Sequence, residues 1–150
     1  MAYMEWSREL DTGIAVIDKQ HRRIVEYINR LQEAINSRNR QDMAAVFEEL
    51  VDYTITHFTF EEDLQEQASY NFRSAHRRVH QVFTKKLEEY KERFEAGDVN
   101  VAHQVNAMLR TWLVNHIKND DADYVPAVKK VVDSGEKKGW IAGSLKKLFG

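Results

Sequence analysis

Apolar residues recur at alternating spacings of three and four in four stretches, and this periodicity constrains the fold more than any other feature of the chain. Such spacing puts the apolar side chains of each stretch on one face of an α-helix. The chain holds one proline and six glycines in 150 residues, so few breakers interrupt helices. The patterns run from Ile17 to Ile35, from Met43 to Leu64, from about Phe72 to Phe94 and from about Val101 to Ile117.

These patterns predict an all-α protein, an up-down-up-down antiparallel four-helix bundle with a short C-terminal helical tail. Helices of about 20 residues joined by short loops become antiparallel neighbours. Polar loops are expected at NSRN (36–39) and EAGDVN (95–100), and Asp11 or Asp18 is expected to cap the first helix. We expect the bundle at residues 1–126 and the extension at residues 127–150.

The C-terminal extension differs in charge from the bundle. Residues 127–150 contain six lysines and two acidic residues, and GWIAGSLKKLFG within them is amphipathic. Residues 135–150 are therefore a candidate for weak docking on an anionic membrane surface or a partner protein. The alternative is that this tail packs on its own bundle.

Composition excludes several classes of function. The chain is 43% hydrophobic and 31% charged with a net charge of −2, which fits one compact domain and gives no broad basic face for nucleic acid. Because it has no cysteine, disulfides, thiolate metal sites and cysteine nucleophiles are excluded. The first ten residues form no apolar signal segment, and no apolar run approaches the ~20 residues that span a bilayer. We expect a cytoplasmic monomer.

Polar side chains interrupt the apolar faces in a repeated way. If such a side chain were buried without a hydrogen-bond partner, it would destabilise the folded state by about 1–3 kcal/mol. A single such histidine is more often a hydrogen-bonded core residue than a ligand, but metal coordination would satisfy the whole set at once. Imidazole and carboxylate without thiolate suit iron, manganese, zinc or copper, and the donors are too many for one ion. The inward-facing residues are His21, His57, Glu61, His76, His80 and His116, whereas the phase of His103 is ambiguous.

The order of these motifs resembles the hemerythrins, specifically the bacterial hemerythrins. The resemblance rests on His21, HFTFEE (57–62), HRRVH (76–80) and HIKNDDADY (116–124), and it covers about residues 3–126, including Trp6 and GIAVIDKQH (13–21). It implies a centre of two non-haem iron ions, joined by an oxo or hydroxo bridge, that binds O2 reversibly. It implies two bridging carboxylates among seven ligands, which are His21, His57, Glu61, His76, His80, His116 and Asp121.

The second carboxylate exposes a conflict between helix geometry and the family pattern. Asp120 lies four residues after His116 and ~40° from it around an α-helix, whereas Asp121 lies ~140° away. The spacing of the family selects Asp121, followed by Tyr124. We therefore expect the regular helix to loosen or turn between His116 and Asp121. In HFTFEED (57–63), Glu62 and Asp63 are interpreted as solvated neighbours.

The surroundings of the expected ligands indicate how the site would work. Gln20, Thr54 and Tyr124 are candidates to hold the second ring nitrogens of the histidines. Apolar neighbours resemble the O2 pocket of the family, although ordinary core packing would select them too. These neighbours are Ile24, Phe58, Trp112, Leu113 and Ile117.

No further acid or base is expected at the site, which favours an oxygen carrier or store over an enzyme. It would deliver O2 to an oxygen-consuming enzyme. The alternatives are an O2 or redox sensor and an iron-handling or peroxide-consuming protein. Ferritin-like di-iron sites are rich in carboxylates, whereas this site is rich in imidazole.

Overall fold

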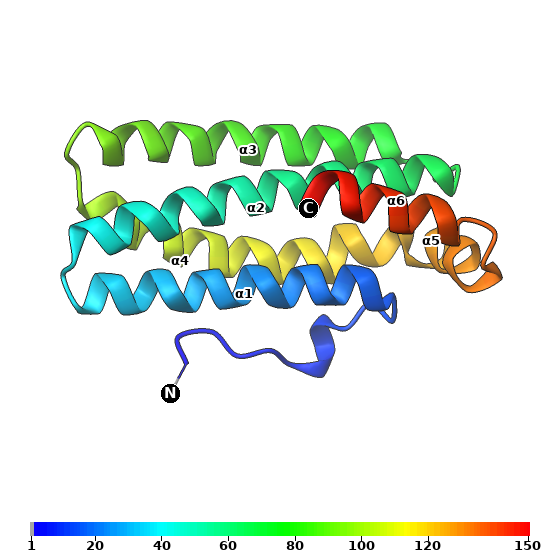
Figure 1. The fold of residues 1–150 in the computed structure, drawn as a ribbon, viewed down its shortest axis with the longest axis horizontal. Coiled ribbons are helices and arrows are strands. Elements are labelled where there is room, and N and C mark those ends of the chain that lie inside the picture. Colours follow the sequence, from blue (N-terminus) through cyan, green and yellow to red (C-terminus); the bar gives the residue numbers. More distant parts are fainter. Residues whose placement is uncertain (1) are drawn as a thin grey trace.

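The structure, a computed structural model, describes residues 2–150. Helices α1 (Ala15–Asn36), α2 (Arg40–Gln67), α3 (Arg73–Glu95) and α4 (Asn100–Asn115) lie side by side along the long axis of the molecule (Figure 1). Helix α1 packs against α2 and α4, and α3 packs against the same two helices. A short 3-10 turn, η1 (Arg8–Leu10), precedes α1. The predicted four-helix bundle is confirmed.

The start of α1 is held from inside the helix. The N-cap position is Ile14, whose side chain forms no capping bond. Instead, the Asp18 carboxylate in the first turn accepts hydrogen bonds from the Thr12 amide (2.8 Å), the Thr12 hydroxyl (2.7 Å) and the Gly13 amide (3.2 Å). Asp18 thus fixes the entry turn, and Asp11 accepts a bond from the Trp6 indole (2.8 Å) instead.

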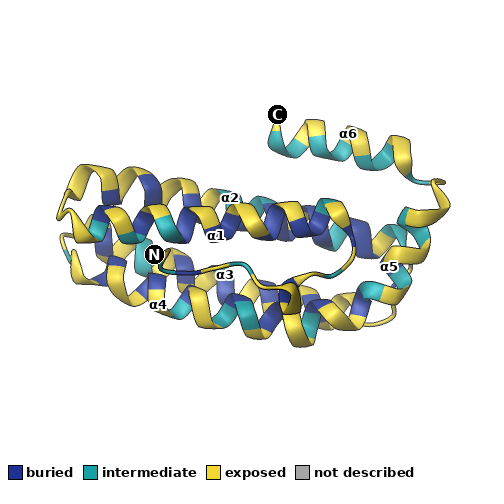
Figure 2. Ribbon diagram, turned by 90° about the horizontal axis from the view of Figure 1, so that it is seen from below, coloured by how far each residue is buried: buried dark blue, intermediate teal, exposed yellow. Residues whose placement is uncertain are grey.

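The apolar faces meet in the interior of the bundle, as the periodicity predicts. Ile17, Ile24, Ile28 and Leu31 of α1 are all 0% exposed, and Figure 2 shows the buried residues of the four helices facing inward. The third apolar pattern, from about Phe72 to Phe94, is the exception, because Phe72 at its start is 62% exposed and Val79 within it is 36% exposed.

The fourth helix does not end where its apolar pattern ends. A π-helical segment, η2 (His116–Asp121), joins α4 directly to α5 (Ala122–Ser134), which runs through Pro126. The helix therefore continues across residue 126, where we placed the boundary of the bundle; that division stays a prediction.

The C-terminal helix α6 (Lys138–Phe149) folds back along α2, on the outside of the bundle (Figures 1 and 2). Gly135 makes this reversal with φ of 75°, a left-handed conformation that favours glycine. On α6, Trp140 packs against the buried Phe60 and Phe149 packs 5.4 Å from Tyr53. The tail thus covers its own bundle with half-buried side chains. No helix within residues 2–150 is long and apolar enough to cross a membrane.

Candidate metal centre

The structure brings together all the residues that the sequence indicated as metal ligands. Helix α1 supplies His21, α2 supplies His57 and Glu61, α3 supplies His76 and His80, and the π-helical segment supplies His116 and Asp121. Each of them is at most 4% exposed. The exposed histidine, His103, lies outside this cluster.

The cluster divides into two groups of donors. His76, His80 and His116, which we call the three-histidine group, lie with Glu61 and Asp121, and their donor atoms are within 4.8 Å of one another. His21 and His57, the two-histidine group, lie with Glu61 within the same limit. Glu61 therefore belongs to both groups.

The two carboxylate oxygens of Glu61 face different groups. Oε1 lies 2.8 Å from Nε2 of His76 and 3.2 Å from Nε2 of His80. Oε2 lies 3.2 Å from Nε2 of His57 and 3.7 Å from Nε2 of His21. A carboxylate that presents one oxygen to each donor group has the arrangement of a bridging ligand.

Asp121 divides its oxygens in the same way. Its Oδ1 lies 3.1 Å from Nε2 of His76 and 3.2 Å from Nε2 of His116, both in the three-histidine group. Its Oδ2 lies 3.2 Å from Nε2 of His21, in the two-histidine group. The two carboxylates thus span the same pair of donor groups.

The π-helical segment explains how Asp121 reaches this position. Hydrogen bonds in a π-helix join residues five apart, and short π segments often mark functional sites. The wider turn brings Asp121, five residues after His116, to the inner side of the helix, where it is fully buried. Asp120, which α-helical geometry would select, is 44% exposed and lies on the outer side of His116. The expected loosening of the helix is confirmed.

Three of the histidines donate a hydrogen bond from their outer nitrogen, Nδ1. His57 donates to the amide oxygen of Gln20 (2.6 Å), and His116 donates to Asp120 (2.7 Å). His80 donates to the Glu62 carboxylate (2.9 Å). A proton on Nδ1 leaves the lone pair of Nε2 facing the cluster, which is the form that a metal ligand needs.

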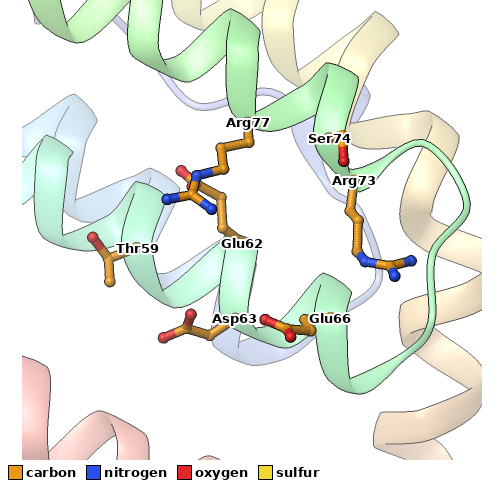
Figure 3. Close-up of a pocket in the computed structure, with 7 residues that line it drawn as sticks. All are labelled: Thr59, Glu62, Asp63, Glu66, Arg73, Ser74 and Arg77. Carbon is orange, nitrogen blue, oxygen red and sulfur yellow. The ribbon is translucent and has the colours of Figure 1, made fainter.

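Gln20 holds a histidine as the sequence suggested, but the interpretation of Glu62 as a solvated neighbour is wrong. Glu62 lies between His80 and Arg77, whose guanidinium is 3.3 Å from its other oxygen; Figure 3 shows Arg77 of α3 reaching toward Glu62 of α2. Asp63 lines the surface pocket beside it (Figure 3). No local spacing signals the contact, because Glu62 and His80 are 18 residues apart.

The other two suggested partners differ from expectation. Tyr124 is fully buried and donates its hydroxyl hydrogen bond to Oε2 of Glu61 (3.0 Å) instead of to a histidine. The buried hydroxyl of Thr54 has no hydrogen-bond partner among residues 2–150. Tyr124 thus positions one of the two shared carboxylates.

The electrostatics of the cluster favour bound cations. Burial alone lowers the pKa of His21, but contacts with Asp121 and Glu61 outweigh it and raise the pKa to about 9. The same balance raises the pKa of His76 to about 10. Burial raises the pKa of Glu61, yet His57 and the other imidazoles hold it well below its usual range. The buried, ionised carboxylates are therefore stabilised by positive charge next to them, which either protons on the histidines or bound metal ions can supply.

Buried polar atoms without hydrogen-bond partners are a second indication of a metal site. Both ring nitrogens of His21 and both carboxylate oxygens of Asp121 are buried and make no hydrogen bond within residues 2–150. Buried polar atoms are normally paired, and metal coordination is one way to pair them. Nitrogen and carboxylate donors without sulfur are the set that non-haem iron accepts.

Two of the expected pocket residues lie against the donor cluster. The Phe58 ring stacks on His80 with ring centroids 3.9 Å apart, and the half-buried Trp112 stacks on His116 at 4.2 Å. The other three, Ile24, Leu113 and Ile117, are buried in the apolar core of the bundle, to which Phe58 also belongs. Aromatic rings thus cover two histidines of the three-histidine group.

Comparison with known proteins identifies the family. A family model described as the hemerythrin HHE cation binding domain matches residues 12–128. A bacteriohemerythrin of Pseudomonas aeruginosa is 46% identical over 154 aligned residues that span all of both chains. A bacteriohemerythrin of Methylococcus capsulatus is 30% identical over 85% of this chain and 98% of its own.

A solved structure agrees with the sequence relatives. The crystal structure of a wild-type hemerythrin superposes with a TM-score of 0.81, at 30% identity, over 85% of this chain and 98% of that one. A family model that matches most of the chain, together with a full-length relative, leads to one conclusion: the chain belongs to the hemerythrin family.

Proposed function

We propose that the cluster holds two non-haem iron ions, one in each donor group. His76, His80 and His116 would hold the first ion, and His21 and His57 would hold the second. Glu61 and Asp121 would be shared between them. The observation that carries this proposal is the division of both carboxylates, each with one oxygen toward either group.

The two ions would receive unequal sets of donors. With the shared carboxylates, the three-histidine group offers five protein donors and the two-histidine group offers four. The ion beside His21 and His57, with fewer protein donors, would therefore be the one to bind O2. When bound, the iron pair supplies the two electrons that reversible O2 binding requires.

Apolar side chains near the donor cluster are shielded from solvent. Ile24, Phe58, Leu113 and Ile117 are each at most 3% exposed. An apolar surrounding disfavours the charge separation that would release reduced oxygen and leave the iron oxidised. These residues line the O2 pocket in this proposal, together with Trp112.

Outer partners distinguish the two ions further. In the three-histidine group, carboxylates accept the Nδ1 hydrogens of His80 and His116, whereas the neutral amide of Gln20 accepts that of His57. A carboxylate that accepts the Nδ1 hydrogen makes Nε2 of the imidazole a stronger metal ligand. The three-histidine group would therefore donate more electron density to its ion than the two-histidine group would to the other.

The function that this arrangement supports best is an oxygen carrier or store that supplies an oxygen-consuming enzyme. Within residues 2–150, the metal-ligating cluster contains no histidine or carboxylate beyond these seven. In this proposal all seven hold metal, so none of them is left to act as a general acid or base. A redox sensor would use the same centre and differs in how reversibly it responds to O2.

The test is a cycle of oxygenation. Purified protein loaded with iron is reduced without oxygen, exposed to O2 and deoxygenated again while its visible absorption is followed. A band that appears with O2 and disappears on its removal, over several cycles, supports the carrier. Rapid oxidation that deoxygenation does not reverse contradicts it and favours the sensor. His57→Ala is expected to abolish the band, whereas His103→Ala, at an exposed histidine, is the matched control.

A further inference from the structure

Two cations of α3 face one groove at the surface of the bundle. Residues 73–87 and 100–115 contain no aspartate or glutamate, although the whole chain carries a net charge of −2. Of the six cations in these two stretches, Arg78 and Lys86 line a groove between α3 and α4. The others point elsewhere: pockets against α2 are lined by Arg73, Arg77 and Lys85, and Arg110 packs over the Tyr3 ring.

The same surface exposes apolar side chains. Val79 is 36% exposed and Val82 68%, and both lie on one face of α3. Phe72, 62% exposed, lies with Val79 in a neighbouring pocket that also contains Asp120 and Asp123. A groove of about 510 Å³ lies between α3 and α4. We call it the α3–α4 groove; it is lined by Val79, Val82, Phe83, Met108 and Trp112, with Arg78 and Lys86 among them.

A column of aromatic rings leads from the α3–α4 groove to the metal centre. The Phe83 ring stacks on Trp112 with centroids 3.7 Å apart and planes 8° apart. Trp112 stacks in turn on His116, at 4.2 Å and 15°. The floor of the groove is therefore in van der Waals contact, through Trp112, with a residue assigned to the three-histidine group.

We propose that the α3–α4 groove is the docking site of an acidic electron-carrier protein, which returns electrons to the iron pair through Trp112 and His116. This inference rests on the proposed function. A ferrous pair that becomes oxidised no longer binds O2, so a carrier has to be reduced again. Two reduced one-electron carriers donate one electron each, which converts two ferric ions to two ferrous ions and leaves two carriers oxidised.

The properties of the surface select this occupant. Transient electron-transfer complexes are small, and complementary charge increases their rate of association more than their affinity. Within residues 2–150 neither Arg78 nor Lys86 forms a salt bridge, and a small apolar patch beside two such cations suits a brief encounter with an acidic protein. The aromatic column provides a path for electrons from the docked protein to the metal centre. A partner that bound only for structural reasons would not need such a path.

Stopped-flow reduction tests the proposal. The oxidised, iron-loaded protein is mixed with a reduced plant-type ferredoxin, an acidic [2Fe–2S] carrier, and separately with photoreduced riboflavin, a small molecule that needs no docking surface. We expect the rate constant with ferredoxin to fall as ionic strength rises, because Arg78 and Lys86 are the charged residues that line the groove. A rate that rises with ionic strength overturns the proposal.

Charge reversal gives the matched comparison. Arg78→Glu with Lys86→Glu is expected to lower the ferredoxin rate by about tenfold or more at low ionic strength and to leave the riboflavin rate unchanged. Lys130→Glu with Lys146→Glu, at exposed lysines of α5 and α6, changes the net charge equally and is expected to have little effect. Equal rates for both double variants overturn the proposal.

Two further outcomes separate the possible failures. Val82→Ser is expected to slow ferredoxin at high ionic strength, where apolar contact remains. A stable dimer that Val82→Ser dissociates would assign the groove to a second copy of the chain and overturn the proposal. If riboflavin restores O2 binding and ferredoxin does not, the docking site is wrong while the proposed function stands; if neither does, both fail.

Discussion

Replacing Asp120 and Asp121 one at a time by asparagine distinguishes the π-helical site from an α-helical one. The Asp121 side chain is 0% exposed and lies 3.1–3.2 Å from Nε2 of three histidines. The Asp120 side chain is 44% exposed and accepts a hydrogen bond from Nδ1 of His116, 2.7 Å away, on the side opposite the donor cluster. Two adjacent substitutions of the same type are therefore expected to have very different effects.

The expected magnitudes follow from these positions. Loss of an outer partner of a ligand histidine lowers metal affinity by about 10–100-fold, which corresponds to about 1.4–2.7 kcal/mol. Asp120→Asn should therefore still hold two ions per chain, but more weakly. Asp121→Asn removes a charged donor from both ions at once and should leave fewer than two ions per chain.

Competition with a chelator under anaerobic conditions, followed by metal analysis of the desalted protein, measures both effects. Asp133→Asn, at an exposed position on α5, is the control for handling and net charge. If Asp120→Asn loses an ion while Asp121→Asn keeps two at native affinity, the carboxylate assignment is refuted and α-helical spacing selects the true ligand.

Three other predictions concern stability and redox potential. Phe60→Ala, at a fully buried ring under α6, should lower the free energy of unfolding by about 3–5 kcal/mol in urea denaturation. Phe72→Ala, at a ring that is 62% exposed, should change it by less than about 0.5 kcal/mol. Equal losses for the two variants would contradict the packing of Phe60. With a chelator present, the metal-free protein should lose stability as the pH rises from about 6.5 through about 9 and 10. The reason is that the raised pKa values of His21 and His76 mean that the folded state holds these protons more tightly than the unfolded state. Urea denaturation at pH 6, 8 and 10 checks this, and a free energy of unfolding that rises with pH would contradict it. Glu62→Gln should raise the reduction potential of the iron pair by roughly 60 mV, which corresponds to a tenfold change in the equilibrium constant of a one-electron reduction. An unchanged potential in a spectroscopic redox titration would contradict the role of the Glu62 carboxylate as the partner of His80.

The bundle could be predicted from the sequence because each long helix carries its own periodic signal. The exception was the end of the fourth helix. The apolar pattern stops near Ile117 because the π-helical turn shifts the phase of later residues, although the helix itself continues to Ser134. Val79 fell outside the core because it lies at the edge of the inward face, ~60° from His76 on the side away from His80.

The site was predictable to the extent that motif spacing carries it. Phase alone placed the histidines and Glu61, but it favoured Asp120, and only the resemblance to the family selected Asp121. Glu62 could not be found, because its contact with His80 depends on how α2 packs on α3 and leaves no local pattern.

The most direct test of the two-iron centre is an anomalous-difference map from crystals of the iron-loaded protein, recorded at the iron absorption edge. The proposed function predicts two peaks, one beside His76, His80 and His116 and the other beside His21 and His57, with density for Glu61 and Asp121 between them. A single peak, or peaks outside this set of side chains, would contradict it.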